Sequence, residues 1–180
     1  MAEEKNRDPA SRLAETLKKL IPLRGQEETQ LGPMMRAIKA VHSVTASGST
    51  SPEDLERQRA GQELFARLVT PAIGVTAQET RVGAVPAEWV RLDYAHDRRH
   101  IILYCHGGSF TCGQLGYARI LASKLALHTG CDTFSFEYRL APEHPYPAAV
   151  QDALAVWDHL MYLGFGAKDV IVAGDSAGGN

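Results

Sequence analysis

The stretch Val170-Ile171-Val172-Ala173-Gly174-Asp175-Ser176-Ala177-Gly178-Gly179 decides the fold. Its β-branched run predicts a short buried strand. The residues after it fit G-x-S-x-G, which places a serine on a sharp strand-to-helix turn with its hydroxyl exposed at the end of a sheet. We expect Ser176 to be a nucleophile, with Gly174, Asp175 and Gly178 as its structural support. A chance match has a probability of about 5 per cent, so the alternative is a glycine-rich turn whose serine only caps a helix.

Composition excludes several classes of protein. The 180 residues are 44% hydrophobic and 22% charged with a net charge of −2, which favours one globular chain and no nucleic-acid partner. The charged residues 1–8 are no secretory signal, and no apolar run could span a bilayer. Three cysteines without metal-ligand spacing indicate reduced thiols in the cytoplasm. We expect no metal and no cofactor, and the sequence leaves the oligomeric state open.

Residues 1–73 are predicted to form a helical N-terminal cap segment. Helical spacing of apolar residues predicts helices over 10–21 and 33–41. Ser51-Pro52-Glu53-Asp54 is a helix start, with a serine cap, an early proline and acids in the first turn, and this third helix should end before Pro71. The cap is either a packed helical subdomain or a lid over a pocket, with Met34, Met35 and Phe65 as candidate lining residues.

Residues 74–180 are predicted to form an α/β unit. Alternation over 80–82 and 88–92, with Gly83 and Pro86 between them, predicts an antiparallel hairpin. Apolar strands over 100–105, 132–137 and 170–175 alternate with helices over 113–130 and 148–163. This alternation predicts a mostly parallel sheet with flanking helices after the hairpin.

A second chemical motif, His106-Gly107-Gly108-Ser109-Phe110, directly follows the strand over 100–105. Acyl transfer creates a tetrahedral oxyanion that needs preorganised N–H donors, and successive glycines let backbone amides face a substrate. The carboxyl ends of parallel strands share one edge, so this loop and the serine turn should meet there. The candidate donors are the amides of Gly107, Gly108, Ser109 and Ala177. The alternative is a tight turn without a chemical role.

These motifs and the run 137–148, Glu-Tyr-Arg-Leu-Ala-Pro-Glu-His-Pro-Tyr-Pro-Ala, closely resemble the hormone-sensitive-lipase-like branch of the α/β-hydrolases. The resemblance implies an α/β-hydrolase fold and hydrolysis of a small acyl ester through an acyl-enzyme on Ser176. It also implies an oxyanion hole around the 106–109 loop and Ala177, and a structural role for His106. Ser109 stands where many relatives have a third glycine. By the same resemblance, the 137–148 loop is expected to be braced by Arg139, Glu143 and Asp152.

A serine of this kind needs a histidine base and an orienting acid, which in this fold follow the nucleophile in sequence. Only four residues follow Ser176. Upstream, His144 in the proline-rich loop is the least implausible substitute, and we do not expect it to serve. We therefore expect the chain to be the N-terminal portion of a longer esterase, truncated after the nucleophile turn and inactive alone. The apolar face of the 170–175 strand should then lie open.

Two further functions use the same scaffold. One is a non-catalytic ligand-binding protein like the plant gibberellin receptors, which keep the pocket and lose the histidine. The other is amide cleavage by the same mechanism, which the sequence does not separate from ester cleavage. All three readings require Ser176 and the loop beginning at His106 to lie together.

Overall fold

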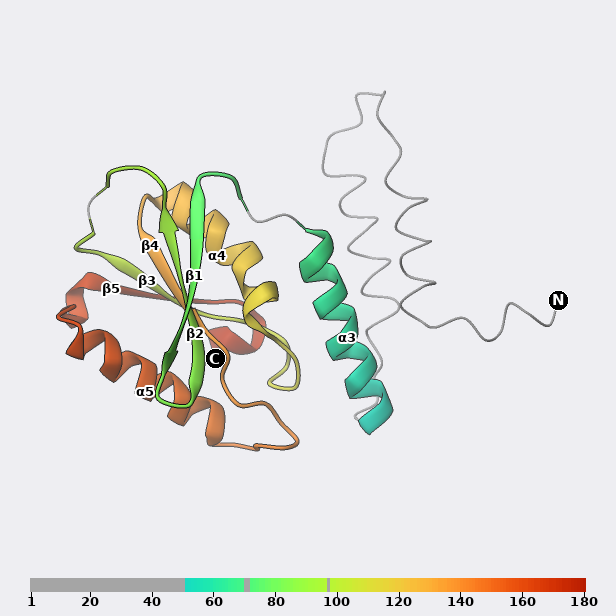
Figure 1. Ribbon diagram of the computed structural model, residues 1–180. Helices are drawn as coiled ribbons and strands as arrows, with labels where there is room; N and C mark the ends of the chain where they lie inside the picture. The colour runs from blue at the N-terminus through green and yellow to red at the C-terminus, as the bar shows by residue number, and fades with distance from the viewer. Residues whose placement is uncertain (1–50, 70–71, 97) are drawn as a thin grey trace, which may run out of the picture. The chain divides into compact units, whose positions relative to one another are not determined.

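The computed structural model describes residues 51–69, 72–96 and 98–180 (Figure 1). The chain divides into two compact units, 1–65 and 66–180, which we describe separately. The predicted helices over 10–21 and 33–41, and the candidate lining residues Met34 and Met35, lie outside the described residues. The predicted boundary after residue 73, and the roles of packed subdomain or lid, stay predictions.

The third predicted helix is confirmed as α3 (Pro52–Leu68). The backbone N–H of Asp54 donates to Ser51 Oγ at 3.3 Å, which satisfies one of the amides at the helix start that have no partner within the helix. Glu53 and Asp54 lie in the first turn, where the helix dipole favours negative charge. The cap, proline and acid pattern therefore identified the start of this helix correctly.

The second unit is built on a five-stranded sheet of order β1-β2-β4-β3-β5 (Figure 1). The strands are β1 (Val75–Val82), β2 (Val85–Leu92), β3 (Ile101–Cys105), β4 (Asp132–Phe136) and β5 (Val170–Gly174). β1 pairs antiparallel with β2 and β2 with β4, whereas β3 runs parallel to both β4 and β5. The predicted hairpin leading into parallel strands is confirmed.

Two details of the hairpin differ from the prediction. Pro86, expected in the turn, lies inside β2 opposite Arg81. It is tolerated there because pairing of β2 with β4 begins only at Ala87, so no bond to β4 is lost at the proline. β1 begins at Val75, five residues before the expected Thr80. Most of this edge strand is exposed, so burial imposes no apolar alternation on its first half.

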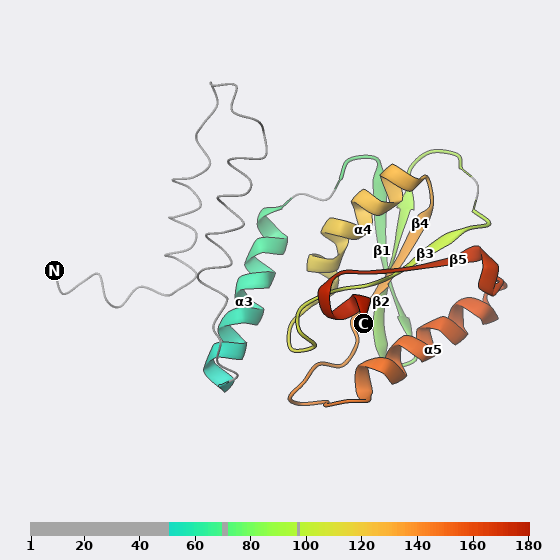
Figure 2. The same cartoon turned by 180° about the vertical axis from the view of Figure 1, so that it is seen from behind.

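Two helices cover opposite faces of the sheet, α4 (Leu115–Thr129) and α5 (Ala148–Tyr162) (Figures 1 and 2). Alternate residues of β3 divide between them. Ile101 and Leu103 belong to the core cluster that contains Val156 and Leu160 of α5. Ile102 and Tyr104 belong to the cluster that contains three buried alanines of α4. A strand buried on both faces explains the continuous apolar run that predicted it.

β5 forms one edge of the sheet and is buried only in part. Val170 is buried, but Ile171 and Val172 are 50% and 60% exposed. The prediction of a buried strand is therefore wrong for these two residues, whereas the predicted open apolar face is confirmed for them. Among the described strands, β5 has one neighbour, β3.

Candidate active site

Ser176 lies on a tight turn directly after β5, at the first position of the short 3₁₀ helix η3 (Ser176–Gly179). Its φ of 50° is a left-handed conformation that non-glycine residues seldom adopt. A Cβ on Gly174 would overlap the carbonyl of Gly178, and a Cβ on Gly178 would overlap the carbonyls of Cys105 and His106. The glycines thus let the turn close and pack against the end of β3, and the serine is left exposed.

The loop after β3 is also strained. Gly108, Ser109 and Phe110 have φ values of 125°, 56° and 60°. The N–H groups of Thr111 and Cys112 both donate to the Gly108 carbonyl, so the loop coils back on itself. Two successive non-glycine residues with positive φ cost free energy, and such strain concentrates at functional sites.

Asp175 joins the loop to the serine turn. Its Oδ1 accepts hydrogen bonds from the Gly107 N–H at 2.8 Å and from the Tyr104 hydroxyl at 2.6 Å. Asp175, immediately before Ser176, and Gly178, two residues after it, thus both contact the start of the loop. The predicted meeting of the two segments is confirmed. The Gly107 N–H, however, already donates to Asp175, so we no longer count it among the candidate donors to an oxyanion.

His106 is fully buried and does not approach Ser176 as a base would. Its ring stacks on Tyr138 with centroids 4.2 Å apart, and Nδ1 lies 2.7 Å from the Gly107 carbonyl. Since a carbonyl only accepts, Nδ1 carries the proton, and Nε2 has no hydrogen-bond partner in the described part of the chain. Burial lowers the pKa of His106, which keeps the ring neutral. The geometry fits a structural role.

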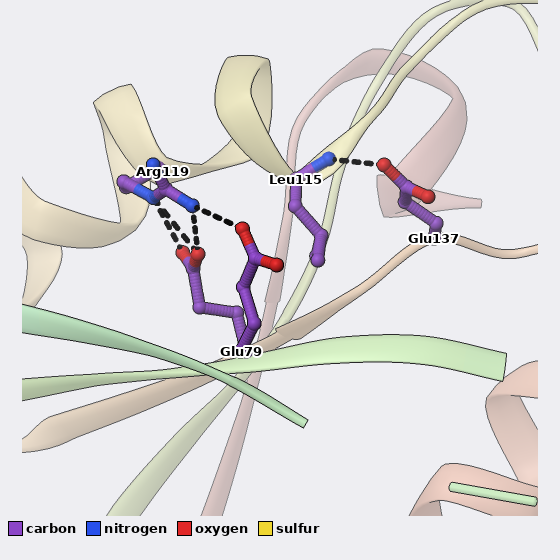
Figure 3. A network of polar contacts seen from close by, with 5 residues as sticks. Glu79, Leu115, Arg119 and Glu137 are labelled. Carbon is purple, nitrogen blue, oxygen red and sulfur yellow. Dashed lines mark hydrogen bonds and ion pairs between the residues drawn. The ribbon is translucent and has the colours of Figure 1, made fainter. Parts of the chain in front are cut away.

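The segment that follows β4 holds the loop at its start, middle and end. The Tyr138 hydroxyl donates to the His106 carbonyl at 2.7 Å. The Ala141 N–H donates to the Phe110 carbonyl at 2.8 Å. At the far end, the Leu115 N–H donates to the Glu137 carboxylate at 2.7 Å (Figure 3). Glu137 thereby caps α4, whose own N-cap residue makes no side-chain cap.

Sequence reasoning assigned no supporting role to Glu137 or Tyr138. The available signal was their position: they follow β4, the neighbour of β3, at the same edge of the sheet. Of the predicted brace, the contact between Arg139 and Asp152 is confirmed, and the role of Glu143 stays a prediction. The Arg139 Nε lies 3.0 Å from each carboxylate oxygen of Asp152 on α5, and the Arg139 N–H donates to Asp152 at 2.8 Å.

A buried ion pair fixes α4 on the sheet (Figure 3). The Glu88 carboxylate on β2 is fully buried and accepts hydrogen bonds from the Arg119 guanidinium on α4, which also contacts Glu79 on β1. Burial raises the pKa of Glu88, and the hydrogen bonds from Arg119 oppose that shift. Because α4 begins where the loop ends, this pair and the Glu137 cap together fix the loop's far end.

No helix in the described ranges is long and apolar enough to cross a membrane. The cytoplasmic location stays a prediction.

A serine on a strained strand-to-helix turn, beside a glycine-containing loop at the carboxyl ends of parallel strands, is the arrangement typical of the α/β-hydrolase fold. Residues 102–180 match the family model described as "alpha/beta hydrolase fold", and this part of the chain has that fold. A solved structure points to a branch within it. The crystal structure of an esterase from the bacterial hormone-sensitive lipase family has a TM-score of 0.70 and 29% identity, covering 81% of this chain and 48% of that one.

Curated relatives agree with this assignment. The chain is 37% identical over 145 residues to an acetyl-hydrolase of Streptomyces hygroscopicus, covering 81% of this chain and 46% of that protein. It is 43% identical over 83 residues to Esterase LipI of Mycobacterium tuberculosis, covering 44% of this chain and 26% of that protein. The chain thus spans less than half the length of these relatives.

Proposed function

We propose that the chain contributes to hydrolysis of a small carboxylic ester by a serine acyl-enzyme mechanism. Ser176 Oγ attacks the ester carbonyl, and its proton passes to a base. The tetrahedral anion then collapses, the base gives its proton to the departing oxygen, and the alcohol leaves while the acyl group stays on the serine. Water attacks this acyl-enzyme, releases the carboxylic acid and restores the hydroxyl. The name of one relative, acetyl-hydrolase, supports a short acyl group.

The amides of Gly108, Ser109 and Ala177 are the proposed donors to the anion. The observation that carries this proposal is the contact between the two segments: Gly107 is bonded to Asp175, immediately before Ser176, and Gly178 packs on His106. Because the loop is braced at three points, its amides need little rearrangement when charge develops, which is the condition for oxyanion stabilisation.

The base is the part that the described residues do not supply. In this part of the chain, the Ser176 hydroxyl makes no hydrogen bond, and the His106 ring is hydrogen-bonded to the Gly107 carbonyl. His144 lies exposed in the loop before α5, and its backbone N–H donates to the Leu140 carbonyl. We propose that a histidine and an acid from outside these 180 residues complete the triad, and that the chain alone does not turn over.

The test uses the 180-residue chain and its Ser176→Ala variant with p-nitrophenyl acetate and butyrate. We expect no difference between them. Joining the chain to the part of the Streptomyces acetyl-hydrolase beyond the matched region should give hydrolysis that Ser176→Ala abolishes. Serine-dependent turnover by the chain alone would overturn the proposed need for an outside base. Hydrolysis by the joined protein that survives Ser176→Ala would overturn the assignment of the nucleophile.

The absence of a base near Ser176 among the described residues also favours a second candidate, a binding protein on the same scaffold. Such a protein would hold an ester or acid without cleaving it. Detection of an acyl-enzyme by mass spectrometry in the joined protein would support the esterase. Reversible binding without acylation would support the binding protein.

A further inference from the structure

A cationic cavity lies at the amino ends of the parallel strands, opposite the carboxyl ends where Ser176 lies. It has a volume of about 670 Å³ and is formed by residues 98–100, which precede β3, and by residues 163–165, 168 and 169, which precede β5. The parallel register pairs Ile101 with Val170, so these two segments meet at the amino ends of the strands. Figures 1 and 2 both show the start of β3 beside the turn between α5 and β5. A volume of this size suits a small-molecule ligand.

The charges around this cavity are unbalanced. Arg98, Arg99 and Lys168 are cationic at neutral pH, and Asp169 is the one carboxylate among the described lining residues. That carboxylate accepts a hydrogen bond from the Gly166 N–H at 3.0 Å, which closes the turn before β5. Arg98 and Lys168 make no hydrogen bond or ion pair with any other described residue. The like charges of Arg98 and Lys168 repel each other, and a bound anion would offset that repulsion.

The cavity also has an apolar wall, formed by Leu163 and Phe165. Phe165 is partly buried against the core, with its ring 6.3 Å from that of Trp89, so this part of the wall is anchored. Leu163, by contrast, is 47% exposed. A ligand that fits both sides carries a multiply charged anionic group beside a compact apolar group.

We propose that this cavity binds an organic phosphate, with the phosphate against Arg98 and Lys168 and the apolar group against Leu163 and Phe165. Arginine and lysine are the side chains that proteins use for phosphate, as a fork of donors and as a point charge. The site is separate from the proposed ester site: β3 and its flanking residues span about 20 Å at the rise of a strand. The proposal therefore goes beyond the proposed function and does not depend on it.

The experiment measures binding of phenyl phosphate, inorganic phosphate and benzoate to the 180-residue chain by isothermal titration calorimetry at low ionic strength. Phenyl phosphate should bind best, since inorganic phosphate lacks the apolar group and benzoate lacks the second charge. Arg98→Gln and Lys168→Gln should each weaken phenyl phosphate binding about tenfold, the loss of one charge-assisted contact. Lys124→Gln on α4 removes the same charge elsewhere and should leave binding unchanged.

Two further measurements keep the test decisive. Circular dichroism and thermal unfolding establish that each variant is folded, and a folded variant with undiminished binding would overturn the assignment of its residue. Vesicles containing phosphatidic acid distinguish a lipid headgroup from a free metabolite. Binding to these vesicles without binding to soluble phenyl phosphate would overturn the proposal, as would equal binding of phenyl phosphate and benzoate.

Discussion

Replacing Asp175 by alanine tests whether its carboxylate holds the serine turn against the loop. The change removes one acceptor oxygen and leaves two donors without it, the Gly107 N–H and the hydroxyl of the buried Tyr104. Each hydrogen bond to a charged group contributes about 1.5 to 3 kcal/mol. Because Asp175 is only half-buried, water can replace part of the loss, and we take the lower value for each bond. Asp175→Ala should lower the free energy of unfolding by about 3 kcal/mol.

Two matched variants divide this effect. Asp175→Asn keeps an acceptor oxygen and loses the charge, so it should lose about half as much stability. Tyr104→Phe removes one of the two donors and should also lose about 1.5 kcal/mol. Urea denaturation followed by circular dichroism measures all three, and hydrogen exchange measures protection of the Gly107 amide. The reasoning is refuted if Asp175→Ala is no less stable than Tyr104→Phe, or if it leaves exchange at Gly107 unchanged.

Three other predictions concern the supports of the site. Arg119→Leu should cost about 3 kcal/mol at neutral pH, because it leaves the Glu88 carboxylate buried without its cation. Burial raises the pKa of Glu88, so the folded state binds the Glu88 proton more readily than the unfolded state. The loss of stability caused by Arg119→Leu should therefore be smaller when unfolding is measured at acidic pH. A loss that does not change with pH contradicts this. Gly178→Ala should lower the melting temperature measured by calorimetry, because its Cβ would overlap two carbonyls, whereas Gly179→Ala, with its nearest atom at 3.6 Å, should not. Tyr138→Phe should cost about 1 kcal/mol and speed hydrogen exchange in the loop it braces, and unchanged exchange would contradict the bracing role.

Local patterns were enough to predict most of the second unit. The apolar run of β3 predicted a strand buried on both faces, and helical spacing predicted α4, which ends at Gly130 in a left-handed conformation. Patterns failed where burial does not constrain the sequence. The first half of β1 is exposed, and Ile171 and Val172 are apolar although half or more of each is exposed.

The site was predictable where a backbone requirement selects a residue type. The tight turn requires glycine at 174 and 178, and the spacing of these glycines is what identified Ser176 from the sequence. The partners of side chains were less predictable, because they depend on which strands become neighbours. The Gly107 amide was expected to face substrate and instead donates to Asp175, a residue 68 positions away in the chain.

The two proposed parts of the chemistry have different structural requirements. Stabilising an oxyanion requires amides fixed in position, and β3 and β5 are adjacent strands whose carboxyl ends bring the loop and the serine turn into contact. Transferring a proton requires a neutral imidazole within hydrogen-bond reach of the hydroxyl, and His106 is stacked on Tyr138 and bonded to Gly107 instead. We infer that the anion site can be assembled by this part of the fold without the base. Variants of Ser176 in the chain alone should therefore leave ester turnover unchanged. Variants of the residues that brace the loop should still change how well the loop amides are protected from hydrogen exchange.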